Sequence, residues 1–251
     1  DDTPVNHVLP AWDLVCGQTA ALGILAADRH RFRTGEGSTM SLALSDVALA
    51  AVAALGHIGE AQVNGTQRER FGNDLYGAYG RDFVTADGER VYAVGISPKQ
   101  WSSLLEATDA VEAVDDIAAA GGYDFRDEGD RFRARDEIGA VIAPWIAARP
   151  LAEVAARFDE LGVCWGRYQT FLELVAEDPR VRPEAGLFRE VEQPAIGTYL
   201  SPGSPLAFDG AIPVEPGAAP ALGEHTDEIL AGELGLSETE IGRLHDEGTV
   251  A

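Results

Sequence analysis

Residues 6–13 read Asn-His-Val-Leu-Pro-Ala-Trp-Asp, and the apolar run from Leu14 to Ala27 follows directly. The proline favours an extended segment and the apolar run predicts a helix, so Asp13 is expected at the start of that helix. Aspartate often caps helices, because its side-chain oxygen accepts hydrogen bonds from the unpaired N–H groups of the first turn. The helix dipole favours an ionised carboxylate there, and such a carboxylate can also act as a covalent nucleophile. The local pattern leaves capping and catalysis both open, with capping the commoner outcome.

Two helices are expected in the first sixty residues. The first runs from Leu14 to about Arg31, and a short link through Gly35 and Gly37 follows it. The second runs from about Ser41 to Ile58. Because apolar residues lie on nearly all of its sides, we expect this second helix to be buried.

The composition limits the function classes that remain. With 251 residues and 45% hydrophobic content, the chain can bury a sizeable core. Its 19 basic and 42 acidic residues give a net charge of −23, which argues against binding to nucleic acid or to an anionic membrane. Lys99 is the only lysine, a composition typical of a halophilic protein from a salt-rich cytoplasm, although a GC-rich genome also favours arginine.

Cysteine content and hydropathy indicate the compartment. Cys16 and Cys164 are too few for a disulfide framework, and we expect both thiols to be free. The longest apolar stretch, Val47 to Leu55, is well short of the roughly 20 residues that span a bilayer, and no stretch resembles a signal peptide. The sequence therefore predicts a cytoplasmic protein.

The middle of the chain has an α/β pattern. Two apolar strands at residues 83–85 and 91–96 flank Asp87-Gly88, which is a hairpin signal. Ser97-Pro98 then predicts the start of a helix that runs through Leu105. Further helical patterns follow, at residues 137–148, 151–161 and 167–176.

The last region begins at about Glu184 and is rich in proline and glycine up to Gly223. Strands are expected at residues 187–191 and 195–200. Thr226 and Ser237 then have the positions of helix N-caps, and Ser237 with Glu240 forms a capping box that needs no catalytic role.

Residues 71–80 lie between the first two regions and contain three glycines and two tyrosines. That composition suits a mobile loop that covers a ligand, and it equally suits an ordinary turn between domains. The residues alone leave both interpretations open.

Two separated stretches then indicate a family. The first contains DLVCG (13–17), AALGILAA (20–27), RTGEG (33–37) and SLALSD (41–46), and the second contains PALGEHTDEIL (220–230), LGLS (234–237) and Ile241. In this order they resemble the family III CoA-transferases, a family that also includes the alpha-methylacyl-CoA racemases. The resemblance implies an α/β fold, with large-domain helices in residues 1–82, a small α/β domain in 83–183 and a segment returning to the large domain in 184–251.

The resemblance places Asp13 on the catalytic aspartate of the family. It also implies that a loop closes over this aspartate, so substrate or CoA contacts are expected from Gly72, Asn73, Tyr76, Gly77 and Tyr79. His7, six positions before Asp13, is a further candidate if folding brings it near, and a structural role is its alternative. The sequence starts at Asp1 without methionine, and we expect an N-terminal Rossmann-like domain with most CoA contacts to be absent from it. Family members form interlocked homodimers, so a homodimer is expected here.

The activity implied is CoA transfer between carboxylic acids through a covalent aspartyl-CoA intermediate. The string at residues 6–13 most resembles the mesaconate branch, whose members move CoA from succinyl-CoA to mesaconate or between C1 and C4 of mesaconyl-CoA. Acyl-CoA and dicarboxylate substrates are then expected. Two alternatives stay open: a 2-methylacyl-CoA racemase or epimerase in which Asp13 is a proton-transfer base, and a non-catalytic fragment that mediates assembly.

Other candidate sites are weak. His30, His57, His225 and His245 show no metal-ligand spacing, and no phosphate-binding or nicotinamide-binding glycine motif is complete. We therefore expect no metal and no permanently bound cofactor, with the coenzyme A thioester serving as a substrate.

Overall fold

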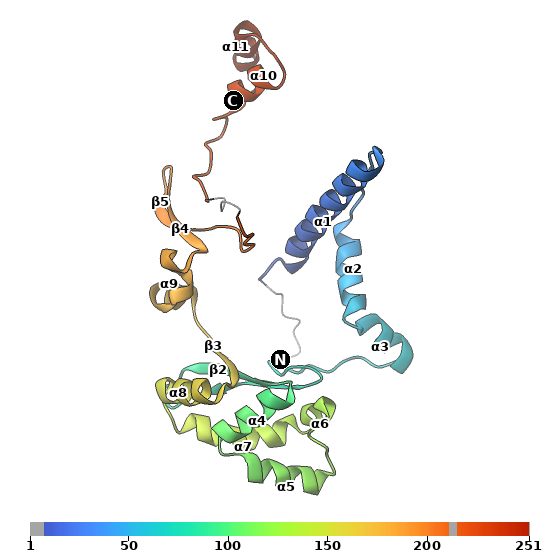
Figure 1. Cartoon of the computed structure of the whole chain (residues 1–251), viewed down its shortest axis with the longest axis vertical. Coiled ribbons are helices and arrows are strands. Elements are labelled where there is room, and N and C mark those ends of the chain that lie inside the picture. Colours follow the sequence, from blue (N-terminus) through green and yellow to red (C-terminus); the bar gives the residue numbers. More distant parts are fainter. Residues whose placement is uncertain (1–7, 211–214, 251) are drawn as a thin grey trace. The chain divides into compact units, whose positions relative to one another are not determined.

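The computed structural model describes residues 8–210 and 215–250. The chain divides into two compact units, Asp1–Gly72 and Asn73–Ala251, and each has its own architecture (Figure 1). The expected domain boundaries, between residues 82 and 83 and between 183 and 184, stay predictions. The Asp74 carboxylate accepts from Arg81 and the Leu75 N–H donates to the Gly80 carbonyl, so these residues are bonded to the strand that follows them.

The first unit contains three helices, α1 (Ala11–Thr34), α2 (Leu44–Ala54) and α3 (His57–Asn64). α1 extends beyond the predicted range at both ends. It stops at Gly35, whose φ of 78° is the left-handed conformation that glycine adopts without strain. The expected single helix from about Ser41 to Ile58 is wrong, because Gly56 has a φ of 81° and divides it into α2 and α3.

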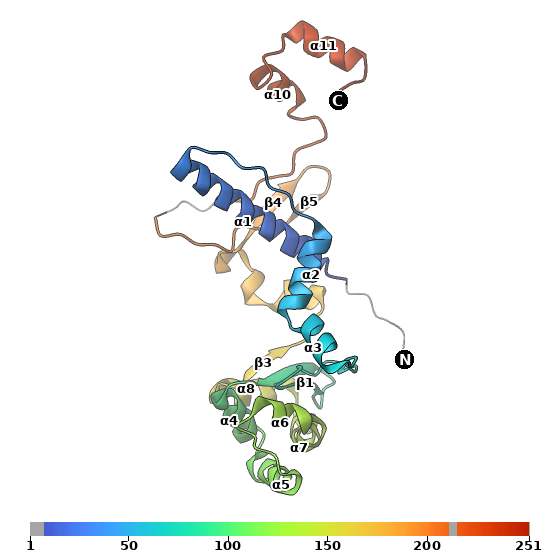
Figure 2. The ribbon, with the colours of Figure 1, turned by 90° about the vertical axis from the view of Figure 1, so that its right-hand side faces the viewer.

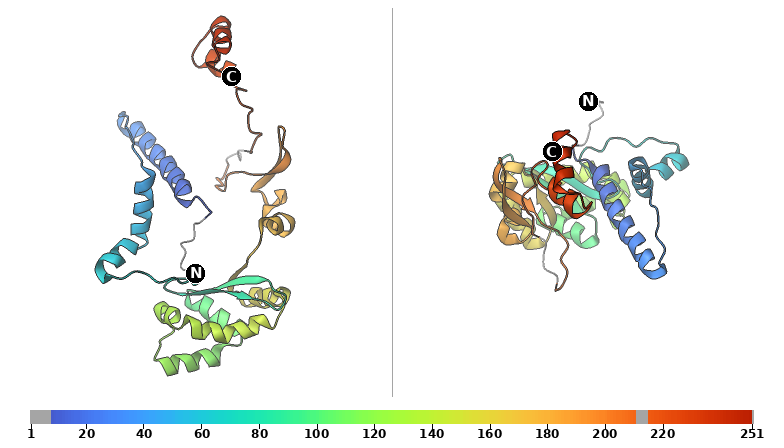
Figure 3. Two further views of the ribbon diagram at one scale, coloured as in Figure 1. Left: turned by 180° about the vertical axis from the view of Figure 1, so that it is seen from behind. Right: turned by 90° about the horizontal axis from the view of Figure 1, so that it is seen from above.

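The link between α1 and α2 returns along α1 (Figure 3). Met40 from this link lies over Gly23, where a built Cβ atom would stand only 2.2 Å from the Met40 sulfur. Glycine at position 23 therefore leaves the space that Met40 fills.

The apolar surface of these helices is largely uncovered. α1 has no buried residue, and Val47 is the buried residue of α2. On α1, Leu25 is 68% exposed and Phe32 is 89% exposed. The expectation of a buried second helix is thus wrong for the described part of this unit, because three helices present too little surface to cover one that is apolar nearly all round.

The second unit is built on a three-stranded antiparallel sheet with the order β1-β2-β3. The helices between β2 and β3 lie on one face of this sheet (Figures 1 and 2), which gives an α/β arrangement. The strands are β1 (Tyr79–Val84), β2 (Arg90–Gly95) and β3 (Cys164–Arg167), and the helices are α4 (Pro98–Ala107), α5 (Val111–Gly121), α6 (Glu128–Arg133), α7 (Arg135–Ala147) and α8 (Leu151–Leu161).

Several local predictions are confirmed in this layer. β1 and β2 form the expected hairpin, and the Asp87 carboxylate accepts from the Thr85 hydroxyl inside its turn. Ser97 caps α4 through a capping box with Gln100. The expected helix from 167 to 176 starts too early, because residues up to Arg167 pair with β2 as strand β3.

The remaining elements lie in the last eighty residues. Thr170 and Glu173 form a capping box that starts the helix after β3, and Ser237 and Glu240 form the predicted one before the last helix. Thr226 is not the predicted N-cap, since the helix already includes it and His225 occupies the cap position. These elements are α9 (Phe171–Glu177), two 3-10 turns (Pro179–Val181 and Pro183–Ala185), the hairpin β4 (Phe188–Gln193) and β5 (Gly197–Pro202), α10 (Thr226–Gly232) and α11 (Glu238–Asp246).

Within the described residues, no single helix has both the length and the apolar character of a membrane span. Two sharply bent pairs, α2 with α3 and α7 with α8, pass that test only when each pair is taken together.

An arginine lies in the middle of the second unit's core. Arg131 on α6 is 1% exposed, and its guanidinium lies 5.2 Å from the centre of the Trp101 ring. It donates hydrogen bonds to the carbonyls of Gly95 (2.8 Å), Ile96 (2.6 Å), Phe125 (2.7 Å) and Arg126 (3.3 Å). These bonds connect the end of β2 and the residue that follows it to the link between α5 and α6.

Replacing Arg131 by methionine should therefore destabilise the second unit strongly. The variant leaves buried carbonyls without donors, and we expect a loss of about 3 kcal/mol or more in the free energy of unfolding. Urea unfolding followed by tryptophan fluorescence measures this loss. The matched control is Arg126→Met, whose side chain is 91% exposed and should change stability by less than about 0.5 kcal/mol. Equal effects of both substitutions would contradict this role of Arg131.

Candidate functional site

Asp13 is the third residue of α1, in its first turn, and its side chain is exposed. The helix starts at Ala11, and Pro10 occupies the cap position without a side-chain hydrogen bond. The capping prediction for Asp13 is therefore wrong, because the helix begins three residues earlier than the sequence pattern indicated. Within the described residues the Asp13 carboxylate has no hydrogen bond and no ion pair, so its oxygens are free to react.

Two features of α1 lie close to Asp13 in the sequence: the N-terminal end of the helix and an apolar hollow along it. First-turn N–H groups of a helix lack intrahelical acceptors and carry the positive end of the helix dipole. Farther along α1, a shallow hollow of about 300 Å³ is lined by Leu14, Val15, Gln18, Thr19 and Leu22. Asp13 does not line this hollow, because successive residues of a helix are turned by about 100° and Asp13 therefore lies on the opposite side of α1.

The other predicted site residues fall into three groups. His7 lies outside the described residues. Gly72, Asn73, Tyr76 and Gly77 are exposed, and their contact with a ligand stays a prediction. Tyr79 is wholly buried.

The loop Gly72–Gly80 is anchored to the second unit by charged side chains that the sequence did not single out. The Asp74 carboxylate accepts from Arg81 Nε (2.8 Å), Arg81 Nη2 (3.0 Å) and Arg135 Nε (3.2 Å). Arg81 also donates to Asp136 at 2.7 Å, and this bond holds the pKa of the Asp136 carboxyl below its usual range. We call Asp74, Arg81, Arg135 and Asp136 the arginine clamp. The sequence contains the local pair Asp74 and Arg81, but no sequence pattern indicates the contact with Arg135.

Tyr79 belongs to the core of the second unit. Its ring packs edge-on against Trp101, with centroids 5.4 Å apart. Its hydroxyl has no hydrogen-bond partner among the described residues, and burial raises the pKa of this phenol above its usual value. The structure thus shows a packing role for Tyr79 at the base of the loop.

The substitution Tyr79→Phe tests that role. Because it removes a buried hydroxyl that lacks a partner, we expect the free energy of unfolding to stay unchanged or to rise by about 1 kcal/mol. Urea unfolding measures the stability. A loss of more than about 1 kcal/mol in the free energy of unfolding would contradict a hydroxyl without a hydrogen-bond partner.

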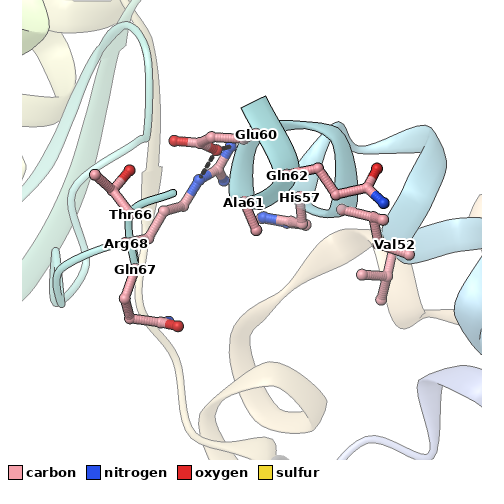
Figure 4. A pocket seen from close by; sticks show the side chains of 9 residues that line it. Val52, His57, Glu60, Ala61, Gln62, Thr66, Gln67 and Arg68 are labelled. Carbon is pink, nitrogen blue, oxygen red and sulfur yellow. Dashed lines mark hydrogen bonds and ion pairs between the residues drawn. The ribbon is translucent and has the colours of Figure 1, made fainter. Parts of the chain in front are cut away.

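A separate pocket of about 480 Å³ lies beside α3 in the first unit (Figure 4). Arg68 donates to Glu60 at 2.5 Å at its edge, and Val52, Ile58 and Ala61 contribute apolar walls. Neither Asp13 nor a residue of the loop Gly72–Gly80 lines it. Across residues 8–210 and 215–250, no group of three or more His, Cys, Asp or Glu side chains is arranged to hold a metal ion.

The chain is similar in sequence and in structure to proteins of one family. The profile of CoA-transferase family III matches residues 1–226. The chain belongs to this family. A CAIB/BAIF family protein from Brucella suis has a similar solved structure, with a TM-score of 0.66 at 20% identity over 92% of this chain and 57% of that protein. The α/β fold expected from the resemblance is confirmed.

Two curated relatives are similar in sequence. The 2-methylfumaryl-CoA isomerase of Chloroflexus aurantiacus is 55% identical over 98% of this chain and 60% of its own length. The succinyl-CoA:mesaconate CoA-transferase of Haloarcula marismortui is 30% identical over 91% of this chain and 55% of its own length. The chain therefore spans a little under two thirds of the curated relatives that it matches.

Proposed function

We propose that the complete protein transfers CoA between carboxylates and that Asp13 is its nucleophile. The observation that carries this proposal is the Asp13 carboxylate itself, exposed in the first turn of α1 and free of any hydrogen bond or ion pair within the described residues. Family membership supports a reaction of CoA groups. Asp74 has the opposite environment, since two arginines occupy its oxygens.

The proposed reaction conserves the thioester in four steps. The Asp13 carboxylate attacks the carbonyl carbon of the donor thioester, and the C–S bond breaks to give a mixed anhydride and CoA thiolate. The thiolate attacks the Asp13 carbonyl, which gives an aspartyl-CoA thioester and releases the donor carboxylate. The acceptor carboxylate then attacks this thioester and expels the thiolate. The thiolate finally attacks the acceptor's acyl carbon, which yields the new thioester and the free Asp13 carboxylate.

Each addition places negative charge on a carbonyl oxygen, and N–H donors stabilise such charge. The unpaired N–H groups of the first turn of α1 are donors of this kind next to Asp13. Water would hydrolyse the anhydride and the thioester, so the reaction also needs a site from which water is excluded.

We propose mesaconate as the substrate framework. The isomerase of Chloroflexus aurantiacus and the transferase of Haloarcula marismortui, which support this choice, are both named for reactions of such C5 dicarboxylates. The identity of 55% favours movement of CoA within one molecule, from one carboxyl of 2-methylfumaryl-CoA to the other. In that case the released dicarboxylate is also the acceptor. It must reorient in the site, so that its other carboxylate faces the aspartyl-CoA thioester before that thioester is hydrolysed.

Trapping with hydroxylamine tests the nucleophile. The complete protein incubated with its CoA thioester should form an Asp13 hydroxamate, because hydroxylamine cleaves activated acyl groups but not a free carboxylate. In Asp13→Asn the adduct should disappear and kcat should fall by about 10³-fold or more, as expected for a lost covalent nucleophile. The matched control is Asp28→Asn on the same helix, where an exposed aspartate pairs with Arg31. Full activity in Asp13→Asn would contradict Asp13 as the covalent nucleophile.

Carbon labelling distinguishes the substrates and the alternatives. Mesaconyl-CoA labelled at C1 should be converted to the C4 thioester without any free acceptor if CoA moves within one molecule. Formation of mesaconyl-CoA only when succinyl-CoA and free mesaconate are supplied would favour transfer between molecules. Deuterium uptake at the α-carbon of a 2-methylacyl-CoA would instead support the racemase, and absence of all three reactions would support a non-catalytic role in assembly.

The assembly of the complete protein stays a prediction. The exposed apolar side chains of α1, including Leu25 and Phe32, support the homodimer expected from the family, and sedimentation of the complete protein measures its oligomeric state.

The single lysine and the net charge of −23 support a salt-rich cytoplasm as the location of the protein.

A further inference from the structure

The loop Gly72–Gly80 is tied down at both ends. At its start, the arginine clamp holds Asp74, whose side chain is only 11% exposed, and the Tyr92 hydroxyl donates to the Asn73 carbonyl at 2.8 Å. At its end, the Leu75 N–H donates to the Gly80 carbonyl at 2.8 Å, which closes the loop on itself. The exposed tip at Tyr76 and Gly77 therefore projects from a fixed stem.

The clamp also reaches this tip. The Arg135 guanidinium that donates to Asp74 lies over the Phe132 ring, 4.5 Å from its centre. Tyr76 packs edge-on against the same ring, with centroids 5.2 Å apart. One guanidinium thus supports the stem through a charged hydrogen bond and the tip through an aromatic contact.

Two glycines provide the space that this arrangement needs. Gly139 is buried on α7, and a built Cβ atom there would stand 2.4 Å from Arg81 Nη1. A Cβ atom at Gly80 would stand 2.9 Å from the Leu75 side chain. Glycine inside a helix is unfavourable relative to alanine, so Gly139 is explained by the room that Arg81 needs to reach Asp74.

We propose that Asp74, Arg81 and Arg135 are positioning residues that set the shape of this loop before the acyl-CoA substrate binds. The link to the substrate rests on the function proposed above and on the substrate contacts expected of this loop, whereas the clamp is a property of the second unit. A loop that already has its binding shape loses less conformational freedom on binding, and a loop that reaches this shape only part of the time binds more weakly by that fraction. The clamp therefore acts on substrate affinity and leaves the reacting atoms untouched.

Hydrogen exchange of the complete protein tests the clamp without any substrate. Asp74→Asn removes the negative charge that Arg81 and Arg135 both contact. Gly139→Ala places a methyl group where the Arg81 guanidinium lies, so this flexible side chain must move. Alanine also has a higher helix propensity than glycine, so the second variant does not weaken α7. Exchange of the Leu75 amide should become at least about tenfold faster in both variants. The matched control Asp82→Asn, on the same strand as Arg81, removes the ion pair with Arg90 of β2 and should leave the exchange of the Leu75 amide unchanged. Because Gly139→Ala does not weaken α7, it keeps the test valid if Asp74→Asn fails to fold.

Steady-state kinetics of the same variants test the link to the substrate. We expect KM for the CoA thioester to rise by about tenfold in Gly139→Ala with kcat within about threefold of the wild type. A purely structural effect would lower the folded fraction, and hence the apparent kcat, at an unchanged KM. Unchanged exchange of Leu75 would overturn the clamp, and faster exchange with an unchanged KM would overturn its positioning role. A wild-type protein without CoA transfer would overturn the proposed function and the substrate part of this inference, while the exchange result would still stand.

Discussion

The second unit depends on one buried guanidinium. Arg131 lies among apolar side chains at 1% exposure, where an unpaired polar group would be costly, and four backbone carbonyls compensate it. Those carbonyls belong to the end of β2, the link between β2 and α4, and the link before α6. Arg131 therefore connects the sheet to its helical layer by hydrogen bonds, beside the apolar core that packs the helices on β1 and β2.

Two further arrangements show how this chain treats its carboxylates. Asp74 is enclosed by Arg81 and Arg135, so its charge is used for structure. Asp13 stands in the first turn of α1 with no partner within the described residues, so its charge remains available for reaction. The same residue type thus has a structural role in the second unit and the proposed catalytic role in the first, and the difference is made by the neighbours that each carboxylate has.

Local sequence signals predicted the elements whose causes are local. The capping boxes at Ser97 and Ser237 and the hairpin around Asp87 need only residues within a few positions of one another. Signals that depend on where a helix starts were less reliable. Pro10 let α1 begin before Asp13, and α10 already includes Thr226, so both of these predicted caps became ordinary first-turn residues.

The sequence by itself determined the family, through two separated motifs, and the position of Asp13 near the start of a long helix. Only the tertiary structure decided that the loop after Gly72 has a clamped stem and that Tyr79 belongs to the core. Asp74 and Arg135 are 61 positions apart, and their contact arises because α7 packs on β1 with Gly139 leaving room for Arg81. Helical and strand periodicities record which face of an element is apolar, but they do not record which charged groups meet when two such faces pack together.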